Sequence, residues 1–187
     1  VSMSDVYGAL TRFEFGAGYR LDDRSELIAR LAFTSGGGSR ALLGVTPGEP
    51  FVGEFESFSE KSFELGYRYH LATFGLFHPY VEGSAGFARL ASISATLTLP
   101  GASLAPINLP VIDASAAPVL AGGAGLLIPL STRVALMVDA NLRWRGAFNS
   151  ANVLVGTGLD TIGDGSARWA FPVVFGAVVN LGPDRVE

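Results

Sequence analysis

Seven segments of the chain alternate apolar and polar residues with a period of two. In one of them, Val134, Leu136 and Val138 share one parity, whereas Met137 and Asp139 share the other. Successive side chains of a β-strand point to opposite faces, so this period predicts strands with one apolar and one polar face. The segments are 7–21, 26–34, 55–70, 77–98, 107–129, 134–145 and 168–181.

The connections between these segments alternate in length. The short ones are 22–25, 71–75 and 131–133, and the long ones are 35–53, 99–106 and 146–167. Short links at one end and long links at the other are typical of an antiparallel up-and-down meander. We therefore expect a single all-β domain over residues 1–187, with loops at 35–53 and 146–167. The 99–106 segment would form the tip of a hairpin that extends beyond its neighbours.

Two architectures fit such strands: a soluble lipocalin-like barrel with the apolar face inside, and a membrane barrel with the apolar face against lipid. Bulky aromatics such as Phe13 and Phe15 occupy the apolar face, whereas glycines such as Gly16 and Gly66 occupy the polar face. The interior of a narrow barrel is crowded, so small residues belong inside. The chain also has only 16% charged residues and a single lysine, Lys61, beside twelve arginines. These features favour the membrane barrel.

The polar face carries equal numbers of positive and negative side chains. A closed interior needs this balance, because each buried ion requires a partner, and arginine makes bidentate bonds to carboxylates. We expect these residues to form an ion-paired network that plugs the lumen. The positions are Arg12, Arg20, Arg30, Arg68, Arg143 and Arg145 together with Glu14, Glu26, Glu60, Glu64, Glu82 and Asp139.

The stretches "FELGYRYHL" (63–71) and "FHPYVEGSAGFARL" (77–90) resemble the strand–turn–strand signature of small OmpA-like outer-membrane β-barrels. The resemblance spans about residues 7–181 and implies a transmembrane barrel of about eight strands with periplasmic turns and extracellular loops. Seven strands are visible, however, and single-chain bacterial barrels have an even number. The eighth strand would either precede Val1 or be formed by residues 151–159. The ending "NLGPDRVE" also departs from the family, which usually ends on an aromatic residue.

Little in the sequence indicates catalysis or cofactor binding. There is no cysteine, and His70 and His78 are the only histidines, so we expect no metal site, no cofactor and no enzyme activity. The formal net charge of −4 argues against a nucleic-acid partner.

The hairpin at 91–116 is nearly uncharged and rich in apolar residues. We expect these residues to be exposed beyond the reach of lipid and to contact a protein partner or a larger envelope assembly. Packing of the hairpin on the other loops is the competing interpretation. The candidate contact residues are Ile93, Leu97, Leu99, Ile107, Leu109, Val111 and Ile112.

Taken together, these patterns predict a non-enzymatic bacterial outer-membrane β-barrel surrounded by lipid, which serves envelope structure and surface contact. A narrow pore or OmpW-like transporter of small or apolar solutes is a second hypothesis, and a soluble lipocalin-like binding protein is a third. The lipid-facing positions would include Phe15, Leu136, Val138, Phe175 and Val179.

Overall fold

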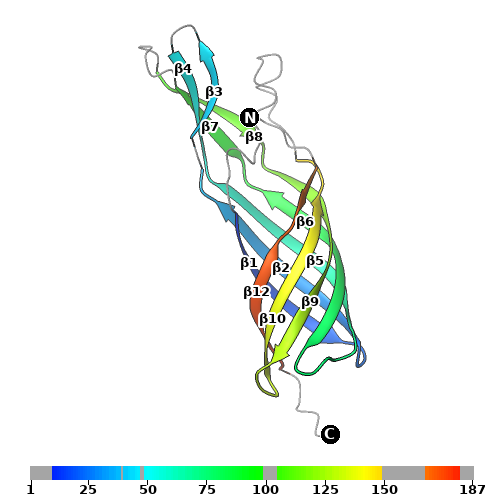
Figure 1. Ribbon diagram of the computed structural model, residues 1–187. Helices are drawn as coiled ribbons and strands as arrows, with labels where there is room; N and C mark the ends of the chain where they lie inside the picture. Colours follow the sequence, from blue (N-terminus) through cyan, green and yellow to red (C-terminus); the bar gives the residue numbers. More distant parts are fainter. Residues whose placement is uncertain (1–9, 39, 47–48, 99–104, 149–166, 182–187) are drawn as a thin grey trace.

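The computed structural model describes residues 10–38, 40–46, 49–98, 105–148 and 167–181, and it is an all-β structure of two antiparallel sheets (Figure 1). Sheet A contains β1 (Thr11–Arg20), β2 (Ser25–Gly36), β5 (Phe58–His70), β6 (His78–Leu90), β9 (Ser115–Pro129), β10 (Val134–Arg145), β11 (Arg168–Ala170) and β12 (Val173–Val179). Sheet B contains β3 (Arg40–Thr46), β4 (Glu49–Phe55), β7 (Ile93–Thr98) and β8 (Ile107–Ile112).

Sheet A is a meander in the order β1-β2-β5-β6-β9-β10, with β11 and β12 both pairing with β10. These last two strands occupy one position, because only Phe171 and Pro172 separate them. Proline has no amide hydrogen to give to a ladder, which explains the interruption. The sheet therefore has seven strand positions, as the seven alternating segments predict.

The predicted closed barrel is not found in the described residues. No strand pairs with the second edge of β1 or with the second edge of β11 and β12, so sheet A is curled but open. Because the number of antiparallel positions is odd, β1 and β12 run in the same direction. One more antiparallel strand would fit between them, and both segments considered for that strand, before Val1 and at 151–159, lie outside the described residues.

Sheet B extends sheet A at the end opposite the short turns (Figure 1). Strands β4, β7 and β8 are separated from β5, β6 and β9 by only two residues each. The prediction of a loop over 35–53 is wrong, because β3 and β4 pair there with a bulge between Leu42 and Gly44. Likewise, 77–98 and 107–129 each divide between the two sheets. The extended hairpin itself is present as the β7–β8 pair.

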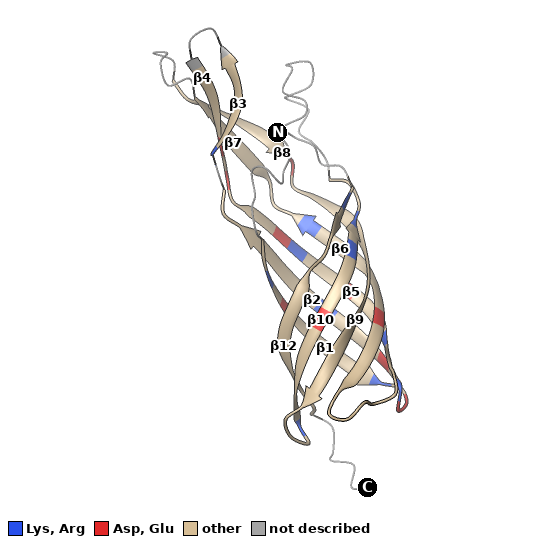
Figure 2. Ribbon diagram, in the orientation of Figure 1, with Lys and Arg blue, Asp and Glu red and all other residues tan. Residues whose placement is uncertain are grey.

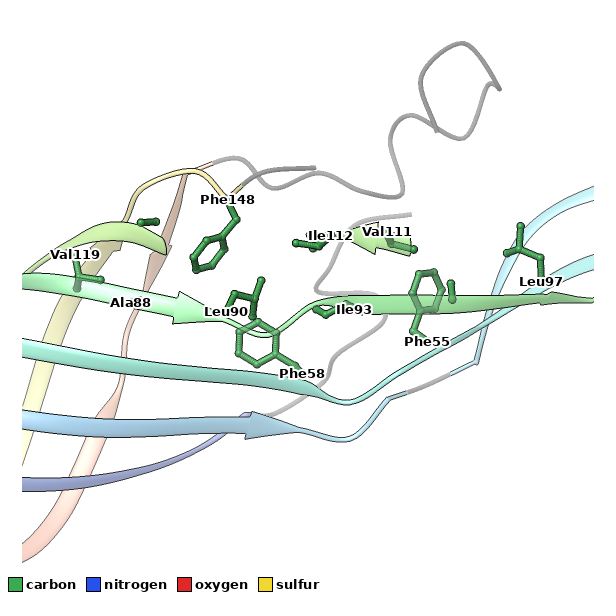
Figure 3. Packing of buried hydrophobic residues seen from close by; sticks show 12 residues of the cluster. Phe55, Phe58, Ala88, Leu90, Ile93, Leu97, Val111, Ile112, Val119 and Phe148 are labelled. Carbon is green, nitrogen blue, oxygen red and sulfur yellow. The ribbon is translucent and has the colours of Figure 1, made fainter. Parts of the chain in front are cut away.

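An apolar cluster fills the junction between the two sheets (Figure 3). Phe58 and Leu90 belong to sheet A, Phe55 and Ile93 belong to sheet B, and Phe148 follows β10. Ala41, Leu43, Phe51 and Leu109 pack against this cluster from sheet B. Folding of the 35–53 segment thus buries side chains that a solvated loop would leave in water.

The two faces of sheet A have opposite character. On the convex face Phe15, Phe87 and Phe175 are exposed, whereas on the concave face Glu64 and Asp139 are buried. Glycine permits the tight curl at Gly86, where a β-carbon would collide with the carbonyl oxygen of Phe63 on the neighbouring strand. No helix in the described residues is long and apolar enough to cross a membrane.

Candidate functional site

The concave face of sheet A holds a network of buried charged side chains from four strands, β2, β5, β6 and β10. Figure 2 shows Lys, Arg, Asp and Glu at intervals along several strands of sheet A, whereas sheet B has few of them. The period-two pattern of each strand places every second residue on this face. The buried charged residues are Arg30, Glu60, Glu64, Arg68, Glu82, Asp139, Arg143 and Arg145.

Glu64 is the centre of one group of contacts. Its carboxylate lies 3.2 Å from Arg12 of β1 and 3.2 Å from Arg143 of β10. It also accepts hydrogen bonds from the hydroxyls of Ser62 and Ser84. Strands β5 and β10 are three positions apart in the sheet, so this contact crosses the concave space and requires the sheet to be curled.

A second group surrounds Glu82 of β6. Arg30 of β2 donates to both of its carboxylate oxygens, and Arg68 of β5 lies 3.0 Å from one of them. Arg30 also lies 3.8 Å from Asp139 of β10 and 3.7 Å from Glu14 of β1. The guanidinium of Arg30 thus contacts carboxylates on β1, β6 and β10, which belong to both halves of the sheet.

The network continues toward sheet B and ends at the apolar cluster. Glu60 accepts from Arg143 and from Arg145, each at 3.0 Å. The Arg145 guanidinium lies over the ring of Phe148, 4.3 Å from its centroid. This cation–π contact connects the charged interior directly to the apolar junction.

Toward the short turns the network ends at Glu26. This carboxylate lies 3.4 Å from Arg68 and 3.2 Å from the His70 imidazole. Arg68 also lies over the ring of Tyr80, which is fully buried. A row of paired charges and packed rings therefore fills the concave space from one end of sheet A to the other.

The structure brings together eleven of the twelve residues expected in the ion-paired network: Arg12, Glu14, Glu26, Arg30, Glu60, Glu64, Arg68, Glu82, Asp139, Arg143 and Arg145. Arg20 is different, because it is exposed at the end of β1. No ion pair between described residues includes Arg20, although it lies directly opposite Glu26 in register, so its place in the network stays a prediction. Among the described residues, β1 is an edge strand.

Sequence reasoning missed His70, Tyr80 and the two serines. His70 shares the parity of Glu64 and Arg68 on β5 and so points inward. The same parity rule would have identified Ser62 on β5, and on β6 it aligns Tyr80 and Ser84 with Glu82. Strand parity was therefore a sufficient signal for all four.

The hairpin residues are mostly buried, which contradicts the expectation that they are exposed. Ile93, Leu97, Val111 and Ile112 belong to the apolar cluster, and Leu109 packs against it. Only Ile107 among the seven is clearly exposed, and Leu99 lies outside the described residues. Strand β7 of the hairpin pairs with β4, and Phe51 and Phe55 of β4 belong to or pack against the same apolar cluster. The hairpin therefore packs on the neighbouring segment that was expected to be a loop.

The described residues contain no group of three or more His, Asp or Glu side chains that could hold a metal ion. Comparison with models of protein families, with curated proteins and with solved structures finds no match. The OmpA-like resemblance therefore has no support from relatives, and the two faces of sheet A are the features that bear on function.

Proposed function

We propose that the protein is a non-enzymatic β-barrel protein of the bacterial outer membrane with an ion-paired interior. The observation that carries the proposal is the inverted distribution of polarity in sheet A. Glu64 is 2% exposed and Asp139 is 1% exposed, whereas Phe15 is 68% and Phe175 is 77% exposed. A soluble lipocalin-like barrel would have the opposite arrangement, with its aromatic residues inside.

Large apolar side chains are exposed on many strands of the convex face. All five positions expected to face lipid lie on the convex face: Phe15, Leu136, Phe175 and Val179 are exposed and Val138 is half-buried. A monomer in water is not expected to expose such a surface, because the exposed apolar patches of soluble monomers are usually limited to a few hundred Å². Lipid is the solvent that matches it.

The interior contacts support a structural role rather than an open pore. The ion pairs of Glu64, Glu82 and Glu60 join strands on opposite sides of the concave space. Fixed pairs of opposite charge leave few carboxylates or guanidiniums available to a passing ion. We therefore propose a plugged lumen, with envelope structure as the main role.

The proposal has one structural requirement. Backbone groups in lipid must all be hydrogen-bonded, so β1 and β12 need partners on their open edges when the protein is in a bilayer. Direct pairing of the two strands would be parallel, and insertion of one antiparallel strand would satisfy both edges.

Insertion and conductance test the proposal separately. We expect the protein to stay in solution only with detergent and to float with phosphatidylcholine vesicles after refolding. We further expect no steady current when it is added to planar bilayers. A monodisperse, detergent-free protein would overturn the membrane assignment. A steady open current would instead favour the narrow pore or transporter.

Surface contact through the 91–116 hairpin stays a prediction. Among the described residues there and on the neighbouring hairpin, the large apolar side chains that are exposed are Ile107, Leu42 and Val45. A partner would therefore meet the outer edges of sheet B, on β3 and β8, rather than the buried side of the hairpin. Free strand edges can pair with a partner's strand.

A further inference from the structure

Two cationic side chains lie directly opposite each other on the convex face of sheet A. Lys61 of β5 pairs in register with Arg89 of β6. Both are exposed, and the residues that flank each of them along its strand are buried. Both side chains therefore point away from the charged interior and toward the surroundings of the protein.

This arrangement is unfavourable unless an anion is present. Side chains directly opposite in an antiparallel pair have β-carbons about 5 Å apart, and like charges there are destabilising. The next residues across the sheet are Phe33 on β2 and Ala116 on β9. No ion pair between described residues includes Lys61 or Arg89. The two cations thus have no acidic neighbour in the part of the chain that the structure describes.

An apolar groove begins beside the two cations. It has a volume of about 270 Å³ and is lined by Phe33, Phe63 and Phe87, with Lys61 and Arg89 on its border. The three rings are 42%, 46% and 67% exposed. A ligand here would place apolar groups against phenylalanine rings and an anionic group between two cations.

The position of the pair along the strands fits the boundary of a bilayer. Lys61 and Arg89 lie near the ends of β5 and β6 that continue toward sheet B. Tyr69 lies eight residues further along β5, near the short turn, and eight residues of strand span roughly 26 Å. Strands tilted by about 40° rise roughly 20 Å across the membrane over that length, which is most of an apolar band of about 25 Å, so Tyr69 would lie near one border and the cations near the other.

We propose that Lys61 and Arg89 bind the phosphate of an anionic lipid, whose acyl chain occupies the groove formed by Phe33, Phe63 and Phe87. This inference rests on the proposed membrane location. Charge complementarity selects an anionic headgroup, and the adjoining groove selects a lipid rather than a water-soluble phosphate. The site would anchor the protein at one leaflet and fix its depth in the bilayer.

Native mass spectrometry of the protein in non-ionic detergent tests the site directly. The protein is titrated with dioleoyl phosphatidic acid and, separately, with dioleoyl phosphatidylcholine. We expect the Lys61→Gln/Arg89→Gln variant to bind phosphatidic acid roughly tenfold more weakly than the wild type, or worse. Its binding of phosphatidylcholine should be unchanged, because the apolar groove is retained.

The matched control is the Arg24→Gln/Arg133→Gln variant, which removes the same charge from the short-turn end. It should keep wild-type affinity for phosphatidic acid. Equal binding by the Lys61/Arg89 variant and the wild type, or an equal loss in the control, would overturn the proposal. Effective competition by glycerol 3-phosphate would overturn the assignment to a lipid.

Failure of this inference is distinguishable from failure of the proposed function. A wild-type protein that does not float with phosphatidylcholine vesicles contradicts the membrane location itself. A protein that floats but has no preference for phosphatidic acid contradicts only the anionic-lipid site. Circular dichroism of both variants in detergent, with a wild-type β-sheet signal, shows that any loss of binding is not caused by unfolding.

Discussion

At the scale of single residues, the stability of the interior depends on how each buried charge is paired. Glu64 contacts two guanidiniums and two hydroxyls, so both of its carboxylate oxygens accept hydrogen bonds. By contrast, the exposed pair of Arg40 and Glu54 is 3.8 Å apart, with 72% and 65% of the side chains accessible. A buried pair is costly to break because the remaining ion is left without a partner. In an exposed pair, water takes the place of the lost partner.

Replacement of Glu64 by glutamine should destabilise the protein by about 3–5 kcal/mol, because Arg12 and Arg143 then lose a buried counter-charge. Urea unfolding in detergent, followed by circular dichroism, measures the change. Glu54→Gln is the matched control and should cost less than about 1 kcal/mol. Equal stability of Glu64→Gln and the wild type would mean that water reaches this pair and screens it.

The turn between β1 and β2 contains a second residue whose charge has a defined role. Asp22 accepts backbone hydrogen bonds from Arg24 at 2.7 Å and Ser25 at 2.8 Å. These bonds favour the carboxylate and hold the pKa of Asp22 below its ordinary value. The carboxylate therefore stabilises the turn fully above the ordinary aspartate pKa, and this contribution is lost as the pH falls through the lowered pKa.

A carboxyl-carbon NMR titration of Asp22 should therefore give a pKa below that of an unstructured aspartate. An ordinary pKa for Asp22 would show that the two backbone hydrogen bonds are not formed in solution.

At the scale of elements, sheet B includes the segment 35–53, which the sequence pattern predicts as a loop. This segment forms strands because its apolar residues pack against those of the neighbouring hairpin. The β3–β4 and β7–β8 hairpins each have too little apolar surface to be stable alone, since an isolated hairpin is marginal in water. Together they cover Phe55, Ile93 and Leu97, and they are joined to sheet A through Phe58 and Leu90. The extension is therefore a continuation of the fold rather than a set of solvated loops.

Truncation of Phe58 to alanine should destabilise the protein by about 3–5 kcal/mol, because this side chain is 3% exposed and lies at the junction of the two sheets. Phe74→Ala is the control, since Phe74 is 81% exposed in the turn before β6 and should change stability by less than about 0.5 kcal/mol. Thermal unfolding of both variants in the same detergent compares them. Similar melting temperatures for the two variants would contradict the packed junction.

At the scale of the whole molecule, the open edges of sheet A are its least satisfied feature. Within the described residues of sheet A, the strands β2, β5, β6, β9 and β10 have partners on both sides, whereas β1, β11 and β12 each have a partner on one side. The ion pairs between β2 and β10 and between β5 and β10 nevertheless hold the sheet in a curled form. Side-chain electrostatics thus maintain a shape that backbone pairing does not complete.

Hydrogen exchange of the protein in detergent should reveal these edges. About half of the β1 amides lack a strand partner and should exchange rapidly, while amides of β5 and β6 should be protected. Mass spectrometry of proteolytic fragments from 11–20 and 58–70 measures the difference. Equal protection of the two strands would show that the edge of β1 is paired and that the sheet closes in detergent.

The sequence by itself determined the strands and their two faces. A period of two assigns Glu64, Glu82 and Arg143 to one face and Phe15 and Phe175 to the other, because side-chain direction in a strand depends only on position along it. The balance of charge on one face and the aromatic residues on the other already predicted which face is buried.

Only the tertiary structure decided the register, the pairing of the loops and the closure of the sheet. Which carboxylate meets Arg30, and whether Lys61 faces Arg89, depends on how two strands are aligned, and a shift of one residue reverses every side chain. Local pattern also cannot show that 35–53 pairs with the next hairpin, since that requires apolar partners distant in sequence. Closure is a property of the assembled edges, so no single segment encodes it.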